Sequence, residues 1–137
     1  MSAIDLLKPN QKPTVIAALR LPSFTFFQDS SARSLTKIID FAIKNVEIAV
    51  KGKIDAVYLQ DMDNYPFSLQ IDPYSVAMMT AIGREIRRNF PNLNLGLSLV
   101  GPGAREPLAI AYAIEAQFVR IKVFVGVMIR SEGIVQG

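Results

Sequence analysis

The residues of this chain that could do chemistry stand directly after its short apolar segments. The stretch QDMDNYPF, residues 60–67, places Asp61 and Asp63 two positions apart after the apolar run IDAVYLQ. Two carboxylates at this spacing can hold a divalent cation such as Mg²⁺, or divide the acid and base roles of a reaction. The same residues suit a simple turn, because Asp and Asn side chains before a proline bond nearby backbone N–H groups. Both interpretations stay open, and no cofactor beyond this Mg²⁺ hypothesis is evident.

Two cationic residues hold comparable positions after other apolar runs. Arg20 follows the first run, TVIAAL, and Lys122 lies within the last, FVRIKVFV. They can act as counter-charges for a phosphorylated ligand, and Lys122 in a desolvated site can act as a Schiff-base nucleophile. The alternative is that they form ion pairs with Asp61 or Asp63 and hold the strand ends together. The candidate ligand-binding residues are therefore Arg20, Gln60, Asp61, Asp63 and Lys122, and the catalytic candidates are Asp61, Asp63 and Lys122.

The composition excludes several other kinds of chemistry. The 137 residues include no Cys and no His, so thiolate nucleophiles, disulfides, zinc fingers and imidazole bases are absent. The net charge is only +3. The densest basic run, GREIRRNF, places Arg84, Arg87 and Arg88 at helical spacing beside apolar residues, which favours a solvated helix face over a nucleic-acid site.

The sequence also favours a cytoplasmic location. The first residues, MSAIDLLKPNQKP, lack the basic and then apolar layout of a signal peptide. No apolar run is long enough to span a membrane. The mean hydropathy of +0.28 is nevertheless high for a small soluble domain, which predicts that some apolar surface stays uncovered.

The elements that must position the candidate residues alternate along the chain. Strands are expected at 14–19, 54–60, 93–100 and 118–123, the first of them buried on both faces. Helices are expected at 35–51, 73–90 and 107–116. Asp72 and Pro73 have the types that begin a helix, and Gly52 has the type that ends one. The chain is expected to finish in a loop and the start of a further helix.

This alternation predicts an α/β fold with parallel βαβ units, in the order (βα)₃β, as a single domain over residues 1–137. Two architectures fit that order: an open doubly wound sheet, or part of a TIM (βα)₈ barrel. A complete barrel typically takes about 250 residues, so this chain has room for half of one.

Four segments make the pattern specific. They are KPTVIAALRLP, IDAVYLQDMDNYPF, LNLGLSLVGPGAREPLAIAYA and AQFVRIKVFVGVMIRSEGIVQG. In this order and spacing the chain resembles the amino-terminal half of the BtpA/SgcQ family, a family of TIM barrels within the ribulose-phosphate-binding group. The resemblance implies a half of a TIM (βα)₈ barrel.

The resemblance implies less about function than about fold. One family member is needed to accumulate photosystem I, and another is encoded among sugar-metabolism genes. The chain departs from the family at the strand ends: Arg20 stands where His is usual, Gln60 and Asp61 where Glu and Asn are common, and Lys122 where Asn is common. We therefore expect a BtpA-like protein that is non-catalytic on its own and has a role related to photosystem I assembly. The alternative is an enzyme or binding protein for a small sugar-like or phosphorylated metabolite.

A half barrel leaves two sheet edges without a partner strand. Its first and fourth strands would expose backbone N–H and C=O groups beside apolar side chains. We therefore expect either a homo-oligomer or completion by a missing carboxyl-terminal half, with a protein partner as a further possibility.

Overall fold

The computed structural model describes residues 13–24, 34–64, 67–131 and 133–137. Residues 1–12, whose sequence lacks a signal-peptide layout, lie outside the described residues. Most of the loop expected between the first strand and the first helix, at 25–33, lies outside them as well.

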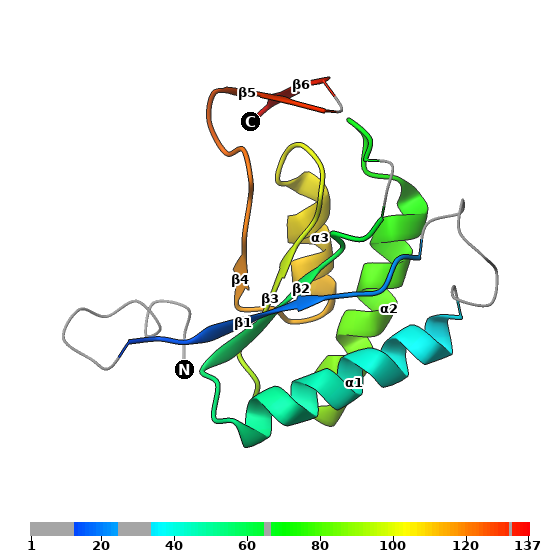
Figure 1. The fold of residues 1–137 in the computed structure, drawn as a ribbon, viewed down its shortest axis with the longest axis vertical. Helices are drawn as coiled ribbons and strands as arrows, with labels where there is room; N and C mark the ends of the chain where they lie inside the picture. Colours follow the sequence, from blue (N-terminus) through cyan, green and yellow to red (C-terminus); the bar gives the residue numbers. More distant parts are fainter. Residues whose placement is uncertain (1–12, 25–33, 65–66, 132) are drawn as a thin grey trace.

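Four parallel strands form the central sheet of the described chain (Figure 1). They are β1 (Ile16–Arg20), β2 (Ala56–Gln60), β3 (Leu95–Ser98) and β4 (Phe118–Val119), in the spatial order β1-β2-β3-β4. The register places Arg20 beside Gln60, and Gln60 beside Ser98. The polar residues at the carboxyl ends of the first three strands therefore stand in one row.

Three helices connect these strands: α1 (Leu35–Lys51), α2 (Pro73–Asn89) and α3 (Arg105–Ala113). Consecutive helices pack against each other, α1 on α2 and α2 on α3. A doubly wound sheet reverses its strand order and carries helices on both faces. The uninterrupted strand order and the neighbouring helices instead match a barrel segment, which confirms the predicted (βα)₃β half barrel.

The local signals at the helix ends are confirmed. Asp72 is the N-cap of α2, and its Oδ1 accepts from the backbone N–H of Ser75 at 2.8 Å. Pro73 occupies the first helical position, where its missing N–H costs nothing. Gly52 follows the last residue of α1 as predicted. The third helix begins at Arg105, two residues earlier than expected.

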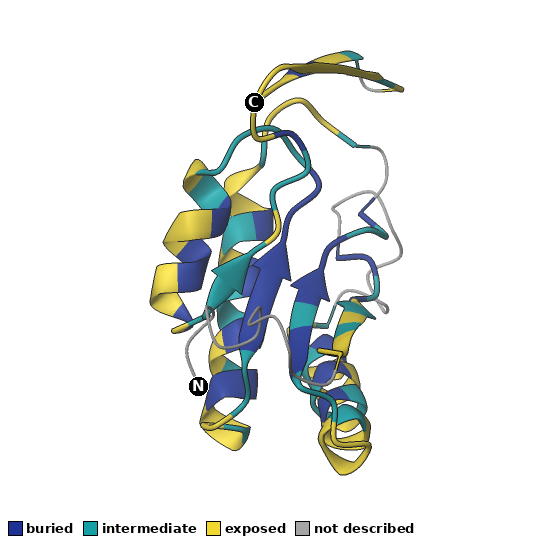
Figure 2. Ribbon diagram, turned by 90° about the vertical axis from the view of Figure 1, so that its left-hand side faces the viewer, coloured by how far each residue is buried: buried dark blue, intermediate teal, exposed yellow. Residues whose placement is uncertain are grey.

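The core lies between the sheet and the helices (Figure 2). Alternate strand residues such as Leu59 and Leu97 face the helices and are fully buried. They pack with the apolar stripes of α1 and α2, including Ile38 and Ile82. This one-sided core aligns the strand ends that carry the candidate residues.

The expectation that the first strand is buried on both faces is wrong. In β1 every second residue is exposed, among them Ile16 and Ala18. Ala17 and Leu19 are partly buried and pack on the core. The reason is that helices cover only one face of the sheet, so the other face of this edge strand meets solvent.

The end of the chain also differs from the prediction. Strand β4 stops at Val119, well before Val123, and its ladder ends with the Arg120 N–H donating to the Leu97 carbonyl at 2.9 Å. The chain then forms an antiparallel hairpin of β5 (Val127–Arg130) and β6 (Gly133–Gln136) instead of a loop and a starting helix.

The hairpin stands beyond the carboxyl end of the parallel sheet (Figures 1 and 2). Its strands are rich in β-branched Val and Ile, which favour extended structure. Gly133 begins β6 with a φ of 123°, a conformation that L side chains rarely adopt. The preference of these residues for extended backbone therefore favours a hairpin over a helix in this segment.

The predicted solvated face of α2 is only partly solvated. Arg84 and Arg88 are exposed, but Arg87 is buried. Its guanidinium donates to the carbonyls of Pro91 and Leu93, at 2.9 and 2.8 Å, and to the carbonyl of Glu115 at 2.8 Å. Spacing alone did not distinguish this arginine, because its acceptors lie in the turn after α2 and in the distant segment that leads into β4.

Candidate functional site

The candidate residues meet at the carboxyl end of the sheet, where active sites of barrel proteins are built. Arg20 ends β1, Gln60 ends β2 with Asp61 and Asp63 after it, and Lys122 follows β4. The parallel register brings these separate segments to one end of the molecule. Their roles as binding or catalytic residues remain predictions, and the structure gives their individual surroundings.

Arg20 and Asp63 form an ion pair between the ends of neighbouring strands. The pair lies at the surface, with the two side chains 60% and 43% exposed. Pairing of this kind was the alternative to ligand binding that the sequence left open for Arg20. A ligand that uses Arg20 as a counter-charge would have to compete with Asp63.

Asp61 has a different environment from Asp63. Its side chain is only 4% exposed, and its Oδ1 accepts from the backbone N–H of Val100 at 2.7 Å. Burial raises the pKa of Asp61 to about 6, although the Val100 N–H and the charge of Lys122 both act to lower it. A carboxyl with a pKa near neutrality can exchange a proton under physiological conditions, which suits acid–base work.

Lys122 lies half-buried near this carboxyl. Its Nζ is 3.3 Å from the thioether sulfur of Met62, and its charge acts on Asp61. The sequence predicted that Arg120 and Lys122 share one strand face. Because β4 ends before both residues, strand alternation does not apply to them, and Arg120 is exposed.

The remaining candidate, Gln60, is buried at the end of β2 between Arg20 and Ser98 in the register. The two carboxylates predicted to share a cation have different partners in the structure. Asp63 pairs outward with Arg20, whereas Asp61 is held against the β3 loop.

Two further polar residues at this end were missed. Asn64 Oδ1 accepts from the backbone N–H of Phe24 at 2.9 Å and so joins the loops after β1 and β2. Within the described residues, Asn64 Nδ2 and Ser98 Oγ are buried without a hydrogen-bond partner. The sequence signal for Asn64 was its place in DMDN, which sequence reasoning assigned to the turn alone.

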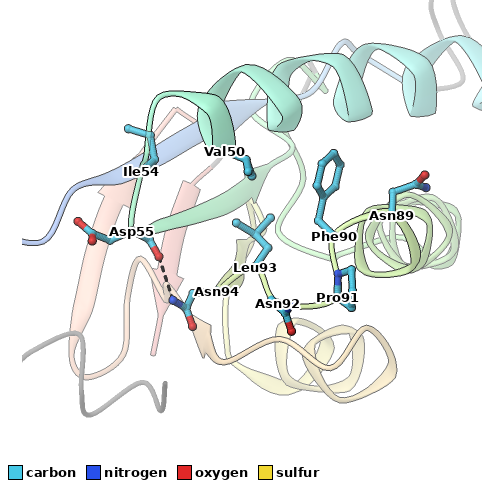
Figure 3. Close-up of a pocket in the computed structure, with 9 residues that line it drawn as sticks. All are labelled: Val50, Ile54, Asp55, Asn89, Phe90, Pro91, Asn92, Leu93 and Asn94. Atoms are coloured by element: carbon cyan, nitrogen blue, oxygen red, sulfur yellow. Dashed lines mark hydrogen bonds between the residues drawn. The ribbon is translucent and has the colours of Figure 1, made fainter.

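A cavity lies at the opposite end of the sheet, where the strands begin (Figure 3). It measures about 360 Å³ and is formed by the end of α1 and the segments that precede β2 and β3. Asn94 Nδ2 donates to the Asp55 carbonyl at 2.9 Å on its wall. None of the predicted site residues lines this cavity, and in barrel folds this end serves stability.

The described chain has neither a metal-binding cluster nor a membrane-spanning helix. No group of three or more acidic, His or Cys side chains there is arranged to hold a metal ion. No helix in the described ranges is long and apolar enough to cross a membrane.

Comparison with known proteins agrees with the strand-end motifs and the half-barrel topology. The sequence model of the BtpA family matches residues 11–137. The chain belongs to the BtpA family. No solved structure matches it.

The relatives of this BtpA-family chain are longer proteins. An uncharacterized protein of Archaeoglobus fulgidus is 32% identical over 90% of the chain and 48% of its own length. An uncharacterized protein of Methanocaldococcus jannaschii is 32% identical over 73% of the chain and 38% of its own length. The photosystem I biogenesis protein BtpA of Synechocystis is 30% identical over 76% of the chain and 36% of its own length. The chain therefore spans less than half the length of these relatives.

Proposed function

We propose that this chain is a BtpA-family half barrel that is non-catalytic on its own and acts in the biogenesis or assembly of a protein complex. The relative from Synechocystis is named for the biogenesis of photosystem I, which supplies the class of process. The observation that supports the proposal is that polar side chains at the strand ends already have partners within the chain. Arg20 pairs with Asp63, and Asp61 is held by Val100, so the polar groups of this half engage one another.

The proposal includes completion of the sheet by a further polypeptide, either a second copy or a carboxyl-terminal half. The open face of β1 exposes Ile16, and the residue before the strand, Val15, is 52% exposed. The β5–β6 hairpin exposes Val127, Ile129 and Ile134. Exposed apolar side chains beside an unpaired strand edge favour pairing with another chain.

Complementation tests the assembly role. A Synechocystis strain that lacks its BtpA would receive this chain together with the carboxyl-terminal half of the Synechocystis protein, and photosystem I would be measured per cell. We expect partial recovery relative to the empty vector. The matched control is the amino-terminal half of the Synechocystis protein with the same carboxyl-terminal half. Recovery with that control but none with this chain would contradict the proposal.

A second candidate function is binding of a small sugar-like or phosphorylated metabolite. It is favoured by the convergence of Arg20, Asp61 and Lys122 at one end of the sheet, where they lie at or after the ends of three different strands. A cation at Asp61 and Asp63 would belong to this function and requires Asp63 to leave Arg20.

Thermal shift measurements with sugar phosphates, with and without Mg²⁺, test this candidate. A stabilising ligand should lose its effect in Asp61→Asn and Lys122→Met and keep it in Lys44→Met, which removes an exposed lysine of α1. The absence of any stabilising compound would speak against the metabolite and leave the assembly role in place.

A further inference from the structure

A second, smaller cavity lies between the loop after β2 and the beginning of α2. Its volume is about 50 Å³. Asp61 and Asn64 line it from the end of β2, Asp72 and Ser75 from the start of α2, and Val100 from the segment after β3. Polar side chains from two different segments thus line a cavity large enough for a water-sized molecule.

One of the residues that line this cavity, Asn64, has an unused hydrogen-bond donor. The residue is 7% exposed, and its orientation is set because Oδ1 accepts from the Phe24 N–H. The other side-chain atom, Nδ2, is buried and has no hydrogen-bond partner in the described chain. A buried donor without an acceptor costs free energy, so native proteins supply one from the protein or from a bound molecule.

Two other residues that line the cavity carry acceptors. Asp61 is almost fully buried, and Asp72 caps α2 with its carboxylate, which accepts from both the N–H and the hydroxyl of Ser75. An anion does not fit this arrangement, because the carboxylate of Asp72 already occupies the helix N-terminus and a second carboxylate lines the same space.

A metal ion does not fit either. The amide Nδ2 of Asn64 is a donor and cannot ligate a cation. A hydroxyl group suits both the donor and the acceptors of the cavity, because it accepts with a lone pair and donates with its proton. A volume of about 50 Å³ suits one or two water-sized molecules, given about 30 Å³ per water in the liquid.

We propose that this cavity is a binding site for a hydroxyl group that accepts from Asn64 Nδ2 and donates to the carboxylate of Asp61 or Asp72. Water and the hydroxyl of a small alcohol supply the same chemistry. The inference stands apart from the proposed function, because it needs neither a partner nor catalysis.

Cross-relaxation between protein and solvent protons in NMR tests the site in the wild-type protein. The Nδ2 protons of Asn64 should show a negative nuclear Overhauser effect to the water resonance, as a long-lived bound water produces. Asn89 is the matched control, because it is exposed and its Nδ2 donates to the Glu85 carbonyl at 2.8 Å. It should show no long-lived contact of this kind.

Addition of methanol distinguishes the two sources of the hydroxyl. If the site admits an alcohol, the Asn64 contact should transfer from water to the methanol methyl protons as the concentration rises. If it persists unchanged, water is the occupant. A contact to neither molecule would overturn the proposal, as would a direct hydrogen bond from Nδ2 to a protein oxygen. Neither measurement depends on a variant that might fail to fold.

Discussion

The Asp61 carboxylate accepts a hydrogen bond from the backbone N–H of Val100 at 2.7 Å, and this contact joins the segments after β2 and β3. The bond favours the charged carboxylate, but burial outweighs it and raises the pKa of Asp61 from 3.8 to about 6. The folded protein therefore binds this proton more tightly than the unfolded chain.

The first prediction concerns the pH dependence of stability. A raised pKa in the folded state means that the contribution of Asp61 to stability is fully present below about pH 4 and is lost as pH rises to about 6. The loss is on the order of 2 to 3 kcal/mol. Asp61→Asn keeps an acceptor for Val100 and cannot ionise, so its stability relative to wild type should increase from pH 4 to pH 7. Urea denaturation of both proteins at several pH values checks this, and a constant difference would contradict it.

The second prediction concerns Arg87, whose guanidinium satisfies carbonyls at the turns that lead into β3 and β4. Arg87→Met would leave several carbonyls unpaired and should lower the free energy of unfolding by about 3 kcal/mol or more. Arg88→Met is the control, because that side chain is 75% exposed and pairs with Glu85 within the same helix. It should cost less than about 0.5 kcal/mol. Equal effects in urea denaturation would refute the structural role of Arg87.

The third prediction concerns Gly96 in β3. The ring of Phe118 from β4 lies over Gly96, and a Cβ atom added there would overlap that ring. Gly96→Ala should therefore cost about 1 to 3 kcal/mol of stability. The cost should shrink in a Phe118→Ala background, which a double-mutant cycle measures. Gly52→Ala, where a Cβ atom meets nothing closer than 3.4 Å, serves as the control. An undiminished cost without the Phe118 ring would show that the contact does not explain it.

The fourth prediction concerns the start of α2. Asp72→Ala removes the cap that accepts from Ser75 and should cost about 1 kcal/mol. Asp40→Ala, an exposed position within α1, should change stability far less. Thermal unfolding followed by circular dichroism compares the two variants. A similar loss in both would argue that general charge, and not the cap, is responsible.

The fifth prediction concerns assembly through the open edge of the sheet. We expect at least a dimer by light scattering at micromolar concentration. Ile16→Lys, on the β1 edge, should shift the mass toward the monomer. Ile48→Lys, on α1, should leave it unchanged although Ile48 is 60% exposed and Ile16 only 40%. A monomeric wild-type protein with native-like circular dichroism would rule out the homo-oligomer.

Local signals predicted much of the fold. The apolar runs gave the first three strands, and the helical stripes gave α1 and α2 nearly to their ends. Asp72 with Pro73 marked the start of α2, because a cap acts through atoms within one turn of the chain. The uninterrupted βα alternation predicted a parallel sheet, since each crossover must return to the same side.

The sequence predicted at which end of the sheet the candidate residues lie, but not the partners of their side chains. Parallel strands must bring Arg20, Asp61 and Lys122 to one end of the sheet, and the chain order alone shows this. The sequence could not tell that Asp63 points to Arg20 while Asp61 is buried against Val100, because adjacent loop residues have no fixed alternation. Asn64 was overlooked for the same reason.

What the sequence by itself determined is the alternating half barrel, the boundaries of α1 and nearly those of α2, and the family to which the chain belongs, all of which depend on short-range patterns. Only the tertiary structure decided which polar side chains are buried: Arg87 against carbonyls of the turns before β3 and β4, Asp61 beneath the β3 loop, and Asn64 in the small cavity. The physical reason is that burial and hydrogen-bond partners depend on segments that meet only after the sheet has formed. The ion pair of Arg20 with Asp63 and the raised pKa of Asp61 both depend on this arrangement of segments.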